Sequence, residues 1–289
     1  MSELRQPHGE RERSDRAVME TEVRPVPGAP ALLVTPSGKR RPWLVVADLH
    51  LGLGEGDRSL PPAPEGNPER LGRSVLEIAR STAASGVVVA GDVKHPIVGT
   101  PRPLRPIVFR FFSQLLEAGL AVDIVLGNHD IGLTPYLPRE VVVHSAAGLR
   151  RDDVGVFHGH RWPSPAVLRA RRIVAGHLHP GFRFAPSGGS ASGKLPCWVR
   201  AEFPPVAEGG AARRFAATEL IVLPAFHPLA GREALNREKP RRSRSFLFGR
   251  FLAEGRPRAY LLDGTDLGPI PTPPSARRSA APRRAGRDP

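Results

Sequence analysis

Five apolar runs of this chain each end in a short polar patch, and this recurrence constrains the fold more than any other feature. The patches are Asp48-Leu49-His50, Gly91-Asp92, Gly127-Asn128-His129-Asp130, His158-Gly159-His160 and Gly176-His177-Leu178-His179. The runs before them are continuous and rich in valine and isoleucine, which is typical of strands buried on both faces. Ligand-binding groups of α/β proteins gather beyond the carboxyl ends of strands, so the patches predict one functional edge.

The order of the runs predicts the class of fold. Apolar runs at 43–47, 87–90 and 122–126 alternate with helical spacing at 71–81 and 107–118, which favours a parallel sheet with right-handed crossovers. Later runs at 141–143, 154–157, 173–175, 195–203, 219–223 and 258–262 have no long helices between them, which favours a second, more antiparallel sheet. We therefore expect an α/β fold, a two-sheet β-sandwich flanked by helices.

Composition along the chain predicts one domain with two unstructured ends. Residues 1–20 are charged and aperiodic, and residues 271–289 are rich in proline, alanine and arginine, so both are expected to be disordered. The domain is expected at 21–270, with loops at 52–67 and at the proline-rich 96–106. No secretory h-region and no run near the ~20 residues of a membrane span is present, which favours a cytoplasmic protein without a membrane partner.

The residue types in the patches favour divalent metal ions. They offer carboxylates, imidazoles and one amide oxygen, a set that suits Mn²⁺, Fe²⁺ or Zn²⁺. The single cysteine, Cys197, excludes a cysteine-rich metal site. Asp48 and His50 are expected on the same side of an extended segment, because the period of a strand is two, and the same holds for His177 and His179. The number of ligands exceeds the need of one ion, which predicts two neighbouring ions, as in phosphate-ester hydrolysis.

Taken in order, the patches resemble the signature of the calcineurin-like metallophosphoesterase superfamily, over about residues 50 to 230. That signature reads Asp-x-His, Gly-Asp, Gly-Asn-His-Asp/Glu, Gly-His and Gly-His-x-His. The resemblance implies a four-layer αββα sandwich and a phosphoesterase that uses two divalent ions, with manganese favoured over iron or zinc.

The resemblance also implies a role for each site residue. One ion is expected on Asp48, His50, Asp92 and His179, and the other on Asp92, Asn128, His158 and His177. His129 is expected to be the catalytic histidine, oriented by Asp130, while His160 is expected beside the ligands. Three further histidines, His95, His144 and His227, lack a partner at ligand spacing and are expected to be structural or surface residues.

Longer motifs and net charge point to a substrate. Gly-Asp-Val-Lys-His, Phe-His-Gly-His-Arg-Trp-Pro, Gly-His-Leu-His-Pro and Leu-Pro-Ala-Phe-His-Pro-Leu-Ala-Gly are similar to SbcD-related phosphoesterases, a prokaryotic branch that includes the ligase-associated DNA-repair endonucleases. This similarity implies nuclease activity and DNA-repair protein partners. The formal charge of +14 independently favours nucleic acid as a partner.

Three functions are compatible with these observations. The first is a dinuclear metal phosphodiesterase acting on nucleic acid, as an endonuclease or phosphodiesterase. The second is a hydrolase of small nucleotides or phosphomonoesters, which the motifs alone do not separate from the first. The third is a catalytically silent binding module, which predicts missing ligands and above all a replaced His129; the intact set argues against it.

Overall fold

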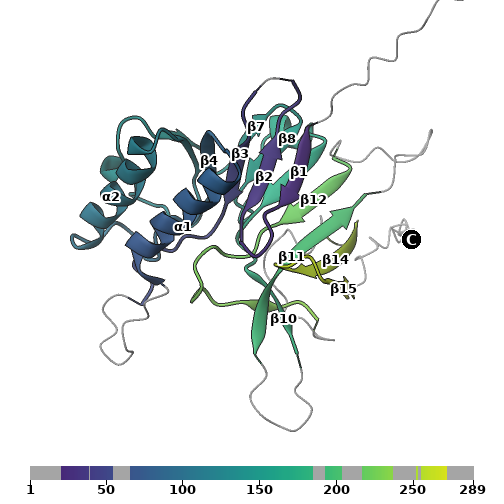
Figure 1. Ribbon diagram of the computed structural model, residues 1–289. Helices are drawn as coiled ribbons and strands as arrows, with labels where there is room; N and C mark the ends of the chain where they lie inside the picture. The colour runs from purple at the N-terminus through teal and green to yellow at the C-terminus, as the bar shows by residue number, and fades with distance from the viewer. Residues whose placement is uncertain are drawn as a thin grey trace, which may run out of the picture.

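Two β-sheets pack face to face, and helices α1 and α2 cover the outer face of the first sheet (Figure 1). The computed structural model describes residues 21–38, 40–54, 66–184, 193–203, 217–236, 252 and 255–271. The two-sheet sandwich predicted from the order of the runs is confirmed. On the outer face of the second sheet, the described residues include the short helix α3 (Pro165–Leu168) and the helical residue Leu252, which pack in one core.

The first sheet has the order β1-β2-β3-β4-β5-β6. Its strands are Glu22–Pro25, Leu32–Thr35, Trp43–Val46, Gly86–Ala90, Ala121–Val125 and Val142–His144. Strands β3, β4 and β5 are parallel, as predicted, whereas β1 and β2 join antiparallel at the edge. Strand β6, which we expected in the second sheet, instead pairs parallel with β5 in the first. The parallel strands bring the carboxyl ends of β3, β4 and β5 to one edge of the sheet.

The second sheet has the order β13-β10-β11-β12-β9-β8-β7, and β14 pairs with β11 and with β15. In chain order its strands are β7 Leu149–Arg151, β8 Val154–Phe157, β9 Arg172–Ala175, β10 Pro180–Arg183, β11 Lys194–Glu202, β12 Glu219–Val222, β13 Glu233–Ala234, β14 Arg256–Leu261 and β15 Asp266–Pro269. The sheet is mixed: β8, β9 and β12 are parallel neighbours, while most other pairs are antiparallel. The more antiparallel character that we expected therefore holds for the flanks and not for the centre.

Helices α1 (Pro68–Ser81) and α2 (Leu104–Glu117) begin and end for identifiable reasons. Asn67 caps α1, since its side chain accepts a hydrogen bond from the Glu69 N–H at 2.8 Å. Helix α2 starts two residues before Pro106, so the predicted loop at 96–106 is too long by three residues. Proline is tolerated there because N–H groups of the first turn have no intrahelical partner. Gly119 follows α2 with a φ of +80°, the conformation that ends many helices.

Alternate residues of the central strands supply two separate cores. In β4, Val87 and Val89 face the helices, whereas Val88 faces the second sheet and shares a core with its residues Ile221 and Trp198. Burial on both faces explains why β3 and β4 have continuous apolar sequences, which Asp123 interrupts in β5. The expectations for 1–20, for residues 55–65 of the loop at 52–67 and for 272–289 lie outside the described residues. Among the described helices, none is long and apolar enough to cross a membrane.

Candidate metal centre

The segments that follow β3 and β4 continue side by side beyond the end of the sheet. The backbone N–H of Asp48 donates to the carbonyl of Gly91 at 3.0 Å, and the N–H of His50 donates to the carbonyl of Asp92 at 2.9 Å. The second sheet reaches the same edge, because the N–H of His177 contacts the carboxylate of Asp48 at 3.0 Å. The site therefore lies across the seam between the two sheets.

Five of the seven predicted metal ligands have left-handed backbone conformations. The φ angles are 59° at Asp48, 41° at His50, 52° at Asp92, 71° at His177 and 43° at His179. Such angles are uncommon outside glycine and cluster at functional sites. They also correct our argument from the two-residue period: these side chains converge from tight turns, not from an extended strand, and His177 and His179 consequently enter different ligand groups.

Two glycines of the patches are needed for close approach. A Cβ at Gly127 would lie 2.2 Å from a carboxylate oxygen of Asp92, and a Cβ at Gly176 would lie 3.0 Å from a carboxylate oxygen of Asp48. Any side chain at either position would displace an acidic residue of the site. These contacts explain why the two loops carry glycine beside their polar residues.

The first ligand group contains Asp48, His50, Asp92 and His179, whose ligand atoms all lie within 4.8 Å of one another. The Nε2 atoms of His50 and His179 are 3.2 Å apart, and Nε2 of His179 lies 3.3 Å from Oδ1 of Asp48. Nitrogen and oxygen ligands about 2.1 Å from one ion lie roughly 3.0–3.5 Å apart, so this spacing fits a shared ion.

The second ligand group contains Asp92, His158 and His177, with Asn128 beside it. Nε2 of His158 lies 3.3 Å from Oδ2 of Asp92 and 3.2 Å from the amide oxygen of Asn128. Asp92 belongs to both groups, as expected for a carboxylate placed between two ions. The structure thus brings all seven predicted ligands together, in the two sets that the family resemblance implied.

Two of the four ligand histidine rings are held by backbone carbonyls at Nδ1, whereas Nδ1 of His50 is buried without a hydrogen-bond partner among the described residues. Nδ1 of His158 is 2.8 Å from the carbonyl oxygen of Ala90, and Nδ1 of His179 is 2.9 Å from that of Gly231. A ring whose Nδ1–H donates to a carbonyl presents an unprotonated Nε2 to a metal, the arrangement usual for metal-binding histidines. The donor set and its supports therefore fit divalent cations.

The electrostatics of the cluster favour a positive charge inside it. Burial alone would raise the pKa of the Asp48 carboxyl, but the neighbouring His179 holds it below its usual value. Burial alone would lower the pKa of His158, but its contacts with Asp92 and Asp48 raise it to about 9. For His177, burial and the charge on His158 lower the pKa to about 4. A buried pair of carboxylates thus holds a proton on His158, at a place where a bound cation would supply the same charge.

His129 lies beside Asp92, between the two loops that follow β4 and β5. Its N–H donates to Oδ1 of Asp92 at 2.9 Å, its Nδ1 contacts the carbonyl of His95, and its Nε2 lies 3.8 Å from Oδ2 of Asp92. The imidazole is therefore held at Nδ1, and Nε2 is directed toward the ligand groups.

The expected role of Asp130 needs correction. Its carboxylate accepts hydrogen bonds from the backbone N–H groups of Val93 at 2.9 Å and Gly127 at 2.8 Å, instead of contacting the ring of His129. Burial raises the pKa of Asp130 to about 6. Asp130 joins the loops that follow β4 and β5, so any influence on His129 passes through the backbone.

Sequence reasoning misplaced one histidine. His95 was expected to be structural, yet its ring centroid lies 5.4 Å from that of His50 and 5.8 Å from that of His129. Its position three residues after the predicted ligand Asp92 was the sequence signal that could have placed His95 near the site. The other two expectations agree with the structure: His144 is bound to Asp123 at 2.7 Å, and His227 is buried. His160 lies beside the second group, with its ring centroid 5.2 Å from that of His158, as expected.

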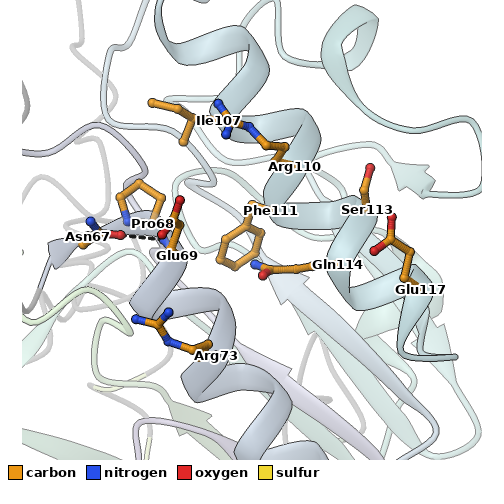
Figure 2. Close-up of a pocket in the computed structure, with 10 residues that line it drawn as sticks. All are labelled: Asn67, Pro68, Glu69, Arg73, Ile107, Arg110, Phe111, Ser113, Gln114 and Glu117. Atoms are coloured by element: carbon orange, nitrogen blue, oxygen red, sulfur yellow. Dashed lines mark hydrogen bonds between the residues drawn. The ribbon is translucent and has the colours of Figure 1, made fainter.

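A separate groove of about 560 Å³ lies between α1 and α2 (Figure 2). Figure 2 shows side chains of both helices, among them Arg73, Phe111 and Gln114, around this groove. None of its lining residues belongs to either ligand group. The chemistry of the described structure is therefore concentrated at the seam between the sheets, away from the helical layer.

Comparison with known proteins finds similar structures but no match to a family model or a curated sequence. The crystal structure of the Pseudomonas putida nuclease MPE is similar, with a TM-score of 0.51, 18% identity, and coverage of 85% of this chain and 100% of that one. The phosphoesterase YfcE from E. coli matches with a TM-score of 0.37 and 14% identity, over 79% of this chain and 97% of that one. With its two mixed sheets and the similarity to the Pseudomonas nuclease, this chain has a metallophosphoesterase-type fold.

Proposed function

We propose that this protein is a metal-dependent phosphoesterase that hydrolyses phosphodiester bonds in nucleic acid with two divalent ions. The observation that carries the proposal is the pair of ligand groups that share Asp92, whose ligand atoms lie within 4.8 Å of one another and in the closest pairs 3.2–3.3 Å apart. Asp48, His50, Asp92 and His179 would hold one ion, and Asp92, Asn128, His158 and His177 the other. We propose manganese for both positions, because the family resemblance favours it among the ions that carboxylate, imidazole and amide ligands suit.

The chain's own residues define how the site would work. Two ions held in these groups supply Lewis acidity and an activated water for in-line attack on phosphorus. Asp92 fixes the spacing between the groups, and the carbonyl supports of His158 and His179 keep both rings turned toward them. His129, held at Nδ1, directs Nε2 to the place where a leaving oxygen would need a proton or a hydrogen-bond donor.

Nucleic acid is the substrate that we propose, for two reasons. The chain has a formal charge of +14, which favours a polyanion. The Pseudomonas putida protein with a similar fold is named a nuclease. Membership of the SbcD-related branch, a cytoplasmic location and DNA-repair partners are further proposals, which rest on the sequence motifs and composition alone.

A substrate panel tests the proposal directly. Purified protein with Mn²⁺ would be assayed on single-stranded DNA, duplex DNA, a bis-ester phosphate and a phosphomonoester. We expect hydrolysis of DNA and of the bis-ester, and none without metal. Cleavage confined to the monoester or to small nucleotides would make the small-molecule hydrolase the correct function, and a lack of all hydrolysis with both ions bound would support the silent binding module.

Deleting residues 271–289 should weaken DNA binding and leave small-ester hydrolysis unchanged. This segment carries Arg277, Arg278, Arg283, Arg284 and Arg287, each able to neutralise one phosphate. Each phosphate contact contributes a slope of about −0.9 to log K against log salt, so the truncated protein should show a flatter salt dependence. Filter binding between 50 and 200 mM salt would measure the slope. An unchanged slope would remove this segment from the DNA-binding surface.

A further inference from the structure

Lys94 is a fully buried lysine beside the candidate metal centre, at 0% exposure. It lies between Asp92, which belongs to both ligand groups, and His95, whose carbonyl contacts the ring of His129. A buried ammonium is unfavourable unless its donors are satisfied, and an apolar side chain of similar volume commonly serves as well or better in a core. A fully buried lysine at this position therefore indicates that its charge or its N–H donors have a structural or functional role.

The donors of Lys94 are directed to backbone carbonyls of two loops. Nζ contacts the carbonyl oxygen of Pro96 at 2.5 Å and that of Ile97 at 3.5 Å, both in the loop after β4. It also donates to the carbonyl of His129, in the loop after β5. An ammonium group has three donors and no acceptor, so three carbonyls around one Nζ match its chemistry.

The contact with His129 completes the restraint of that residue. The N–H of His129 is bound to Asp92, its Nδ1 to the carbonyl of His95, and its carbonyl to Lys94. Only Nε2 has no such backbone or lysine contact, and it lies 3.8 Å from Oδ2 of Asp92. Asp130 joins the same two loops in the complementary way, since its carboxylate accepts hydrogen bonds from the N–H groups of Val93 and Gly127.

We propose that Lys94 is a positioning residue for His129: its buried ammonium fixes the His129 carbonyl and thereby the orientation of the imidazole beside the shared carboxylate of Asp92. This inference rests on the proposed function, in which His129 assists the leaving group. It assigns Lys94 no contact with substrate or with metal. It predicts that the effect of losing Lys94 is expressed only through His129.

A double-mutant cycle tests the proposal. Lys94→Met should lower kcat for a bis-ester phosphate by about 10–100-fold, the usual effect of removing a group that supports a site residue. KM and metal content, measured by elemental analysis, should stay near wild type. In a His129→Gln background, Lys94→Met should have no further effect on kcat, because the ring that it positions is gone. An equal loss in both backgrounds would overturn the proposal.

Two other readouts separate positioning from a general loss of structure. Diesters with a phenyl leaving group should be affected more than p-nitrophenyl diesters, as for His129→Gln, because the poorer leaving group needs more assistance. Hydrogen exchange should become faster in peptides covering 127–133 and in the 94–97 loop that Lys94 also contacts, with the rest of the protein unchanged. Uniform loss across both leaving groups, or unchanged exchange in this segment, would contradict the proposal.

The controls keep the test interpretable. Thr100→Val removes the 2.9 Å bond from the Thr100 hydroxyl to the carbonyl of Gly132, which joins the same two loops without touching His129, and should keep the wild-type rate. Lys94→Gln retains an N–H donor and should fall between wild type and Lys94→Met. If neither Lys94 variant folds, the role is structural and the proposal is wrong. If wild-type protein hydrolyses no phosphate ester, the proposed function fails instead, and hydrogen exchange alone then decides whether Lys94 orders the His129 loop.

Discussion

Asp92→Asn should abolish binding of at least one metal ion and reduce diester hydrolysis by at least about 10³-fold, the loss of several kcal/mol of transition-state stabilisation. The change is nearly isosteric, and an amide oxygen can still accept the 2.9 Å hydrogen bond from the His129 N–H. The shared negative charge between the two ligand groups is lost, however. Elemental analysis of protein equilibrated with Mn²⁺ should fall from about two ions per chain to one or fewer.

Asp123→Asn is the matched control for that experiment. Asp123 is also a buried aspartate, on β5, but its carboxylate is bound to His144 and Arg151 at 2.7 Å each. Its loss should lower Tm, because the contact with Arg151 joins the two sheets, and should leave metal content unchanged. Full metal content and full activity in Asp92→Asn would refute the dinuclear assignment.

His129→Gln should separate chemistry from metal binding. We expect kcat to fall by about 10²–10⁴-fold, the usual share of a positioned general acid, while both ions stay bound. His129 belongs to neither of the two ligand sets that share Asp92, although its ring lies with those of His50 and His95 in a third histidine group whose nitrogens are within 4.8 Å of one another. Retained metal in His129→Gln therefore separates the first two sets from this third group. The paired measurements are steady-state kinetics and elemental analysis of the same preparation.

His177→Ala provides the comparison for His129→Gln. His177 belongs to the second ligand group, so its removal should lower metal content as well as rate. If His129→Gln loses metal to the same degree, His129 is a ligand and not a proton donor. If its rate is unchanged, assistance to the leaving group comes from another residue, and His95 becomes the first to test because its ring stacks near that of His129.

The central strands and the site residues were predictable from sequence for the same physical reason. Strands β3 and β4 are buried on both faces, so their sequences are continuous apolar runs that need no alternation to be recognised, and β5 departs from this pattern only at Asp123 and at the exposed Ala121. Each polar patch follows such a run, and parallel neighbours end at a common edge. The convergence of Asp48, Asp92 and Asn128 therefore followed from the order of the elements alone.

Other features depend on contacts that a local pattern does not contain. Strands β7 and β13 are three and two residues long, too short for a periodic signal. The left-handed backbone of His177 and His179 was also not predictable from strand alternation, although the family resemblance placed the two residues in different ligand sets. Lys94 shows the same limit, because lysine normally indicates a solvated surface and only the packed structure places its amine among carbonyls.

The position of the ligands on both sheets makes metal affinity and conformational stability a single linked quantity. Asp48 and Asp92 follow strands of the first sheet, and His158 and His179 follow strands of the second. An ion that binds only when these segments meet stabilises the native state by RT ln(1 + [L]/Kd), about 4 kcal/mol at a thousandfold excess over Kd. Tm should therefore rise with the free concentration of metal and fall on chelation. Conversely, a substitution that loosens the packing between Val88 and Ile221 should lower Tm, and it should raise the apparent Kd for metal in inverse proportion to the folded fraction once that fraction falls below one.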